Sequence, residues 1–155
     1  MALTLVGLRE RAPVGVTAPP APAWTVEDWR DMPAEEILRM FAEREPDGLI
    51  WAEGTHTEQV GGVRRHALRP AEALLIYTAP PSRSVLNAAL ETTGAHRLYV
   101  AWVPLPPTDA NRERKELLGL CRYTLSHFEG RADLDRMASA RGLSREALLW
   151  GLRLL

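Results

Sequence analysis

Ala73-Leu-Leu-Ile-Tyr-Thr78, Val85-Leu-Asn-Ala-Ala-Leu90 and Arg97-Leu-Tyr-Val-Ala-Trp-Val103 are the three runs that decide the fold of this chain. The first and last are short apolar runs rich in branched and aromatic residues, which is typical of strands buried on both faces. The middle run spaces its apolar residues as a helix does, and Ser82 or Ser84 can cap its start. The stretch therefore predicts two parallel strands joined by a right-handed helical crossover.

A second strand, helix and strand precede this unit. Residues 24–28 alternate in side-chain type and predict a short edge strand, and residues 48–53 predict the next strand. Residues 33–44 carry apolar side chains at helical spacing, and Asp31 can cap that helix. Residues 54–68 are polar, contain two adjacent glycines and predict a surface loop or weak hairpin. We expect a small Rossmann-like α/β fold, with about four mostly parallel strands covered on both faces.

The last 48 residues change character and predict three helices. The first begins at Thr108 or Asp109, and the second and third are joined by Gly142-Leu-Ser144. A short helix pair with a glycine turn resembles a helix-turn-helix, so we expect a winged-helix-like module whose wing is missing or lies beyond the end of the chain. We divide the chain into an upstream strand and proline-rich linker (1–23), an α/β domain (24–107) and a helical module (108–155).

Charge is distributed unevenly along the chain. The net charge is −1, which argues against a general polyanion-binding field. Residues 24–58 contain ten acids and three arginines, whereas residues 111–155 contain nine bases and six acids.

Cys121 is the single cysteine, which excludes an internal disulfide and fits a reducing compartment. No apolar run of membrane-spanning length and no signal-peptide pattern occur, so we expect a soluble, cytoplasmic protein without membrane contact.

Several phrases of the sequence resemble a known family. They are Val26-Glu-Asp-Trp-Arg30, Leu74-Leu-Ile-Tyr-Thr-Ala-Pro-Pro81, Arg112-Glu-Arg114 and Leu143-Ser-Arg-Glu-Ala-Leu-Leu149, following the proline-rich linker. In this order they resemble the C-terminal accessory domain of some bacterial RecJ proteins. These are 5′→3′ single-strand DNA exonucleases of the DHH phosphoesterase superfamily, active in recombinational repair. The resemblance covers residues 24–155.

The resemblance implies an accessory domain without catalytic activity. A two-metal phosphoesterase needs several Asp and His ligands around cations about 3.5–4 Å apart, and no Asp-His-His run occurs here. No cofactor is expected for this chain, because Mg²⁺ or Mn²⁺ would belong to a catalytic core elsewhere in such an exonuclease. The family implies two partners, the rest of the exonuclease chain and the acidic C-terminal tail of single-stranded DNA-binding protein, which ends in an apolar residue with a free carboxylate.

A receptor for such a tail needs an apolar pocket and cations. Ligands of open α/β sheets favour the carboxyl ends of the strands, where Arg83, Arg112, Arg114 and Lys115 are expected. Arg83 follows the strand at 73–78 and begins a helix, while the other three follow the exit of the next strand. Cations are electrostatically unfavourable at a helix N-terminus, so a cluster there favours a role in binding. Ordinary solvated charges are the alternative explanation.

Two other functions remain open at this point. The helix-turn-helix could bind DNA directly, although its recognition helix, residues 144–155, offers Arg145 and Arg153 among mostly apolar side chains. The chain could also be a small Mg²⁺-dependent phosphoesterase that uses acids at strand ends. Its candidate ligands are Asp28, Asp31 and Glu53, which helix capping and solvation also explain.

Two smaller features complete the predictions. Arg64-Arg65-His66 forms a basic cluster that we interpret as a solvated loop, because no aromatic residue is adjacent to it. Trp51 and Trp102 are predicted to lie in the core or at the interface between the sheet and the helical module. A role in stacking on nucleic-acid bases is the less favoured interpretation of these tryptophans.

Overall fold

The computed structural model describes residues 24–107, 109–127 and 131–155, so the predicted upstream strand and linker lie outside the described residues. The described chain forms a four-stranded, wholly parallel sheet in the order β1-β4-β3-β2. Its strands are β1 (Thr25–Asp28), β2 (Leu49–Trp51), β3 (Ala73–Thr78) and β4 (Arg97–Val103). This confirms the α/β class, the four strands and the parallel pairing of the two central ones.

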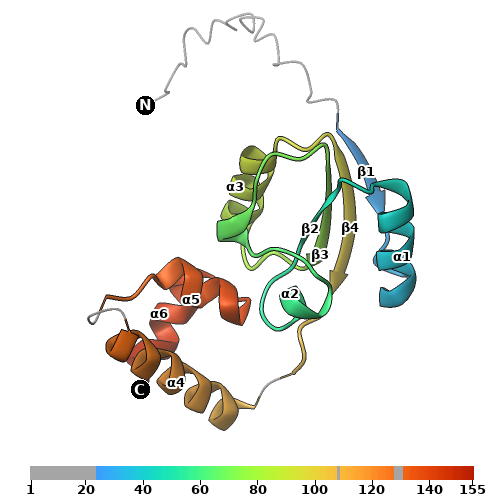
Figure 1. The fold of residues 1–155 in the computed structure, drawn as a ribbon. Coiled ribbons are helices and arrows are strands. Elements are labelled where there is room, and N and C mark those ends of the chain that lie inside the picture. The colour runs from blue at the N-terminus through green and yellow to red at the C-terminus, as the bar shows by residue number, and fades with distance from the viewer. Residues whose placement is uncertain (1–23, 108, 128–130) are drawn as a thin grey trace, which may run out of the picture.

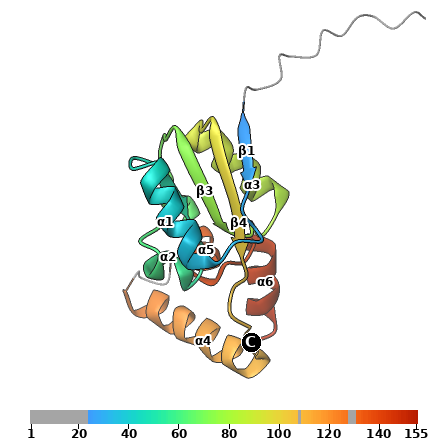
Figure 2. The same ribbon diagram turned by 90° about the vertical axis from the view of Figure 1, so that its right-hand side faces the viewer.

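Helices cover both faces of the sheet and its carboxyl end (Figures 1 and 2). α1 packs on one face and α3 on the other, while the last three helices gather below the carboxyl ends of the strands. The helices are α1 (Ala34–Arg44), α2 (His56–Gln59), α3 (Arg83–Thr93), α4 (Ala110–His127), α5 (Leu134–Arg141) and α6 (Arg145–Arg153), with a short 3₁₀ turn, η1 (Arg65–Ala67), before β3. None of these described helices is long and apolar enough to cross a membrane.

The sheet separates two hydrophobic cores. Side chains alternate between the faces of a strand, so Leu75 and Tyr77 of β3 face α1, whereas Leu74 and Ile76 face α3. All six residues of β3 are buried, which explains why five of them, from Ala73 to Tyr77, form a continuous apolar run instead of alternating. α4, α5 and α6 enclose a third, smaller core around Leu148.

Some local predictions are confirmed and others need correction. The Ser82 hydroxyl accepts a hydrogen bond from the Val85 amide at 3.2 Å and caps α3, as predicted. Asp31 does not cap α1, because the cap position is Pro33 and it has no side-chain hydrogen bond. The segment 54–68 is not a hairpin; it holds α2 and η1, and its Val63 forms a parallel bridge with Trp51 of β2.

A buried ion pair joins the sheet to the helical module. Glu53 follows β2, is wholly buried and binds the guanidinium of Arg65, with Nη2 2.9 Å from Oε2. The same nitrogen donates to the carbonyl oxygen of Leu143, in the turn between α5 and α6, at 2.7 Å. The amide of Gly54 donates to the carbonyl oxygen of Ser139 at 3.0 Å. We call these contacts the Glu53 clasp, and they fix α5 and α6 against the carboxyl end of the sheet.

A second ion pair holds α4 in place. Arg141, the last residue of α5, binds the carboxylates of both Glu113 and Glu116 of α4. The pKa of Glu116 is lowered, chiefly by the hydrogen bond from Arg112 and further by the charge of Arg141. α4 is therefore tied to α5 by charge as well as by the packing of Leu117.

Acid should weaken the amino end of the sheet through Glu45. Arg97 donates to this carboxylate at 2.7 Å and 2.8 Å, and the Tyr99 hydroxyl donates to it at 2.7 Å. The Arg97 hydrogen bonds are the main cause that lowers the pKa of Glu45 below its usual 4.5. A lowered folded-state pKa stabilises the fold above the unfolded pKa, and this stabilisation is lost as the pH falls through the folded value.

We therefore expect the free energy of unfolding to fall as the pH drops below about 4.5, and to fall less steeply in Glu45→Gln. Urea titrations at a series of pH values measure both slopes. Glu43→Gln is the matched control, since Glu43 is exposed and binds only the exposed Arg39 within the described chain. Equal slopes for wild type and Glu45→Gln would contradict the prediction.

Candidate functional site

A basic hollow opens between the loop before β3 and the helices α4 and α5. Its volume is about 340 Å³. The side chains that line it come from three separate parts of the chain, namely Arg64, His66, Leu120, Tyr123, Thr124, Arg131, Asp133, Arg136, Met137 and Ala140. We call it the basic hollow, because three arginines and His66 surround it while Asp133 is its one carboxylate.

The cations of the basic hollow are incompletely neutralised. Arg64 lies 3.5 Å from Glu58, and its buried Nε has no hydrogen-bond partner among the described residues. Arg136 lies 3.3 Å from Asp133, whose carboxylate also accepts the amides of Asp135 and Arg136 as the cap of α5. Arg131 is exposed and forms no ion pair with any part of the chain that the structure describes. The hollow therefore retains positive charge that an anionic ligand can bind.

The remaining surface of the hollow is apolar. Met137 is buried in the core of the helical module, and Leu120 packs against the same core. The Tyr123 ring is half exposed and stacks on His127, with ring centroids 4.3 Å apart. Cations beside an aromatic and aliphatic surface suit a ligand that carries both carboxylates and an apolar group.

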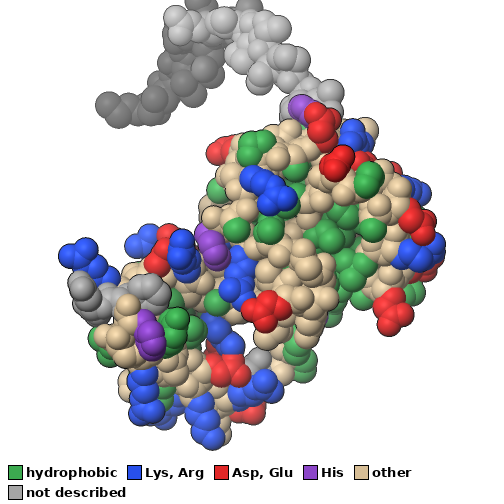
Figure 3. Space-filling model, in the orientation of Figure 1, with side chains coloured by type: hydrophobic (Ala, Val, Ile, Leu, Met, Phe, Trp, Pro, Cys, Tyr) green, Lys and Arg blue, Asp and Glu red, His purple; other side chains and the backbone are tan. Residues whose placement is uncertain are grey.

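Positive charge gathers over the helical module as a whole. Figure 3 shows Lys and Arg side chains crowded around the helices at the lower left, while acidic side chains are frequent over the sheet. This distribution agrees with the uneven charge of the sequence, which is acidic over residues 24–58 and basic over residues 111–155. The field around the basic hollow therefore attracts anions, although the whole chain is nearly neutral.

The structure separates the cations that the sequence suggested. Arg83 begins α3 and is exposed, without an ion pair to a described residue. α5 and α6 lie between the start of α3 and α4 in both ribbon views (Figures 1 and 2). The start of α3 and the cations of α4 therefore lie on opposite sides of α5 and α6, and a peptide site shared by them stays a prediction.

The three cations of α4 lie near one another but have local explanations. Arg112 binds Glu116 at 2.9 Å across one helical turn and is 70% exposed. Arg114 borders an apolar hollow of about 260 Å³ with Leu117, Leu154 and Leu155, and Lys115 is exposed. Glu113 lies in the first turn of α4 and supplies the negative charge that a helix start favours, so the cluster is less unusual than its sequence suggested. Whether these cations bind a peptide stays a prediction.

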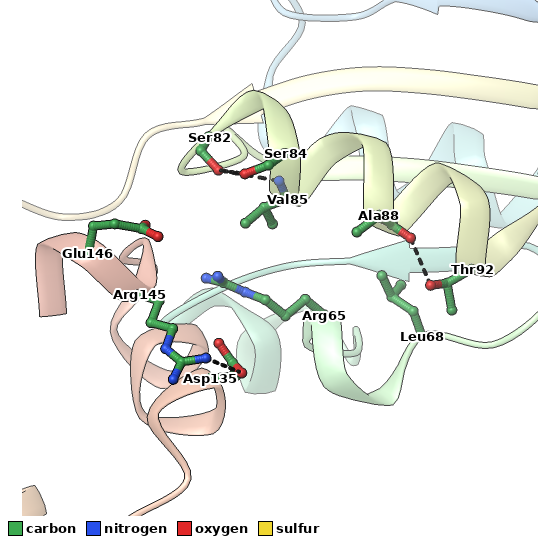
Figure 4. Close-up of a pocket in the computed structure, with 11 residues that line it drawn as sticks. Arg65, Leu68, Ser82, Ser84, Val85, Ala88, Thr92, Asp135, Arg145 and Glu146 are labelled. Carbon is green, nitrogen blue, oxygen red and sulfur yellow. Dashed lines mark hydrogen bonds and ion pairs between the residues drawn. The ribbon is translucent and has the colours of Figure 1, made fainter. Parts of the chain in front are cut away.

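A hollow of about 320 Å³ does lie beside the start of α3 (Figure 4). Ser82 and Ser84 of α3 face Arg65, Asp135, Arg145 and Glu146 across it. The two arginines and two acids balance each other, and Arg65 is already bound to Glu53. This hollow lacks the surplus of positive charge that the basic hollow has.

The acidic strand ends do not meet. β1 and β2 are opposite edges of the sheet, so Asp28 and Glu53 are separated by β4 and β3. The backbone amide, Nε and Nη2 of Arg30 all donate to the Asp28 carboxylate and lower its pKa to about 2, and Arg65 binds Glu53. No group of three or more His, Cys, Asp or Glu side chains suited to a metal ion occurs among the described residues. The phosphoesterase alternative gains no support from this geometry.

The helix pair α5 and α6 is present, but its turn faces the sheet. The Leu143 carbonyl oxygen in that turn is bound by Arg65, and Leu148 of α6 is wholly buried. The exposed large hydrophobic side chain of α6 is Trp150, over which Arg153 lies at 5.4 Å. α6 thus offers few cations to a DNA groove, and direct DNA binding stays an untested alternative.

Sequence reasoning missed most of the basic hollow. It noted Arg64-Arg65-His66 but interpreted the whole cluster as a solvated loop, whereas Arg65 is mostly buried against Glu53 and its neighbours line the hollow. Arg131 and Arg136 were not singled out. The positive excess of residues 111–155 was the available signal, yet it does not show which of nine bases lie near residue 64.

Comparison of the chain with protein-family models, curated proteins and solved structures finds no match. The fold and the site alone therefore define the class of protein, a parallel α/β sheet with a basic helical module docked at its carboxyl end.

Proposed function

We propose that this chain is a non-catalytic interaction module that binds the acidic, apolar-ended tail of a partner protein in the basic hollow. The observation that carries the proposal is the combination of incompletely neutralised arginines with the apolar surface of Leu120, Tyr123 and Met137 in one cavity. Carboxylates of the tail would accept hydrogen bonds from Arg64, Arg131 and Arg136, and its last side chain would contact the apolar surface.

The resemblance to RecJ accessory domains suggests which larger protein this module would serve. On this proposal the chain belongs to a cytoplasmic 5′→3′ single-strand DNA exonuclease, and α4 to α6 form a winged-helix-like module. The ligand would be the tail of single-stranded DNA-binding protein. The chain would use no cofactor itself, and the Mg²⁺ or Mn²⁺ of the reaction would be held by the catalytic core.

Calorimetric titration of the chain with an acidic nonapeptide that ends in phenylalanine tests the proposal. We expect one peptide to bind per chain. Arg64→Glu and Arg136→Glu should each weaken binding about tenfold or more, since hydrogen bonds to charged groups contribute about 1.5–3 kcal/mol. Amidation of the peptide's terminal carboxylate should weaken binding as well, because it removes one of the charges that the arginines bind.

Arg83→Glu is the matched control, as Arg83 is exposed and lies outside the lining of the basic hollow. It should leave the affinity unchanged. Loss of binding in Arg83→Glu with normal binding in Arg64→Glu would place the site at α3 and contradict the proposal. Tight binding of a DNA oligonucleotide that weakens steeply with salt would favour the DNA-binding alternative instead.

A further inference from the structure

Hydrophobic side chains gather on the surface over β1 and β4, at one edge of the sheet. Figure 2 shows β1 at the edge of the sheet, beside β4. The large exposed hydrophobic residues of this region are Trp24, Val26 and Trp102, which expose 48%, 60% and 40% of their surfaces. Exposed apolar groups of this size that cluster on one surface mark interaction sites more often than scattered ones do.

α3 covers its face of the sheet incompletely. The core on that side draws buried residues from β2, β3, β4 and α3, and none of its members within the described chain comes from β1. Val26 of β1 pairs with Leu98, which belongs to this core, so Val26 lies on the same face beyond the edge of α3. Val26 is 60% exposed, so α3 does not bury this part of the sheet.

The backbone of β1 is also open. β1 is the outermost strand and pairs only with β4 among the described strands. The amides of Thr25 and Trp29 donate to carbonyl oxygens of His96 and Val100 at 2.9 Å and 2.8 Å. Because amides alternate in direction along a strand, those of Val26 and Asp28 point away from the sheet. An edge with free donors beside an apolar surface is a template for another strand.

The backbone at Trp102 is consistent with a surface role for this side chain. Trp102 has a φ of 49°, the one positive value for a non-glycine residue in the described chain, where β4 and β3 shift register. Such a conformation costs about 1–3 kcal/mol. Ala101 and Val103 contact the α1-side core, so Trp102 points to the α3 side. Arg30 lies 5.0 Å over its ring and is held there by Asp28. The predicted placement of Trp102 in the core or the module interface is thus wrong.

The charge near the edge indicates the chemistry of the partner. Residues 24–36 contain five acids against one base, Arg30. Arg30 pairs with Asp28 and Arg44 pairs with Glu27, so the negative excess rests on Asp31 and the start of α1. A second copy of this chain would bring two such acidic surfaces together, and a nucleic acid would be repelled as well. A segment with basic residues at its ends is attracted instead. We propose that β1 binds an extended segment of a partner protein as a fifth strand, with apolar side chains at alternate positions and Lys or Arg at both ends.

Amide hydrogen exchange of the full chain tests this proposal. The probe is an end-blocked peptide of alternating Val and Thr with two Lys at each end. We expect the Val26 and Asp28 amides to exchange rapidly in the free chain and at least about tenfold more slowly with the peptide. Raising the salt from about 0.05 M to 0.5 M should weaken binding, since the Debye length shortens.

Two matched controls separate strand addition from general hydrophobic contact. The same peptide with alternate backbone nitrogens methylated cannot complete the ladder on its β1-facing side, so it should give no protection. Val26→Lys places a charge on the exposed edge and should abolish binding, whereas Asn87→Lys, exposed on α3, should not. Both variants should keep the wild-type unfolding transition.

Several results would overturn the proposal. They are slow exchange of Val26 and Asp28 in the free chain, a concentration-dependent dimer that protects them, no binding of the Val-Thr peptide, and equal binding of the methylated peptide. None of these outcomes affects binding of an acidic peptide in the basic hollow, because β1 contributes no residue to that cavity.

Discussion

Replacing Arg65 with methionine should destabilise the protein by about 3–5 kcal/mol, the usual result of leaving a buried charge without its partner. Glu53 is wholly buried and accepts hydrogen bonds from Trp51 Nε1 at 2.8 Å and from the Arg65 backbone and guanidinium. The methionine side chain fills similar space but supplies no donors. The substitution also removes the hydrogen bond to the Leu143 carbonyl oxygen, so the docking of α5 and α6 should weaken.

Urea unfolding followed by circular dichroism measures this loss. Arg69→Met is the matched control, since Arg69 is exposed in the same segment and forms no ion pair with a described residue. The double variant Glu53→Gln with Arg65→Met should lose less stability than Arg65→Met alone, because no charge is then left buried. A loss in Arg65→Met no larger than in Arg69→Met would show that the clasp contributes nothing to stability.

The fold could be predicted because its signals are local. β3 is apolar at five of its six positions, and Ser82 stands three residues before the amide it caps, so short windows of sequence carry both elements. The failures have physical causes. Pro33 already provides an extended backbone at the start of α1, which displaces Asp31 from the cap position. A bulge in β4 turns Trp102 outward, and no pattern of residue types announces a bulge.

The site could be predicted only as a kind of chemistry. The positive excess of residues 111–155 was visible in the sequence. The need for an apolar pocket beside it followed from the kind of ligand that the resemblance implies. The cavity itself is built from residues 64–66, 120–124 and 131–140, which meet because the Glu53 clasp docks the helical module. Of the three consecutive basic residues 64–66, Arg65 forms the ion pair with Glu53, whereas Arg64 and His66 line the basic hollow. Contacts between residues that lie far apart in the chain produce no repeating pattern in the sequence, so they could not be predicted from it.

The same clasp connects stability to binding. Arg65 lies between Arg64 and His66 of the basic hollow, so loss of its contacts should disturb both neighbours. Titrations of the hollow should therefore use substitutions at Arg64 or Arg136, whose side chains are outside the clasp. Variants of Arg65 report on folding and ligand binding at once, and cannot separate the two.

Gly142→Ala is the second change with a large expected effect, a loss of about 2–5 kcal/mol. Gly142 ends α5 with a φ of +66°, and a side chain in that left-handed conformation costs about 1–2 kcal/mol. A Cβ at this position would also lie 2.3 Å from Leu105 Cδ1, so Leu105 or the turn must shift. Overpacking of this kind costs about a further 1–3 kcal/mol. Thermal or urea unfolding measures the total.

Gly94→Ala separates the two contributions, because Gly94 ends α3 with a φ of +59° and has nothing within 4 Å of an added Cβ. The Gly94→Ala variant should therefore lose only the free energy that the left-handed backbone conformation costs. Adding Leu105→Ala to Gly142→Ala should then recover part of the loss, although Leu105→Ala by itself destabilises the wild type. Since Leu105 lies between the sheet exit and the α5–α6 turn, this coupling measures how firmly the helical module is seated. Equal losses in Gly142→Ala and Gly94→Ala would mean that Leu105 moves aside freely and that the module is held by the Glu53 clasp without it.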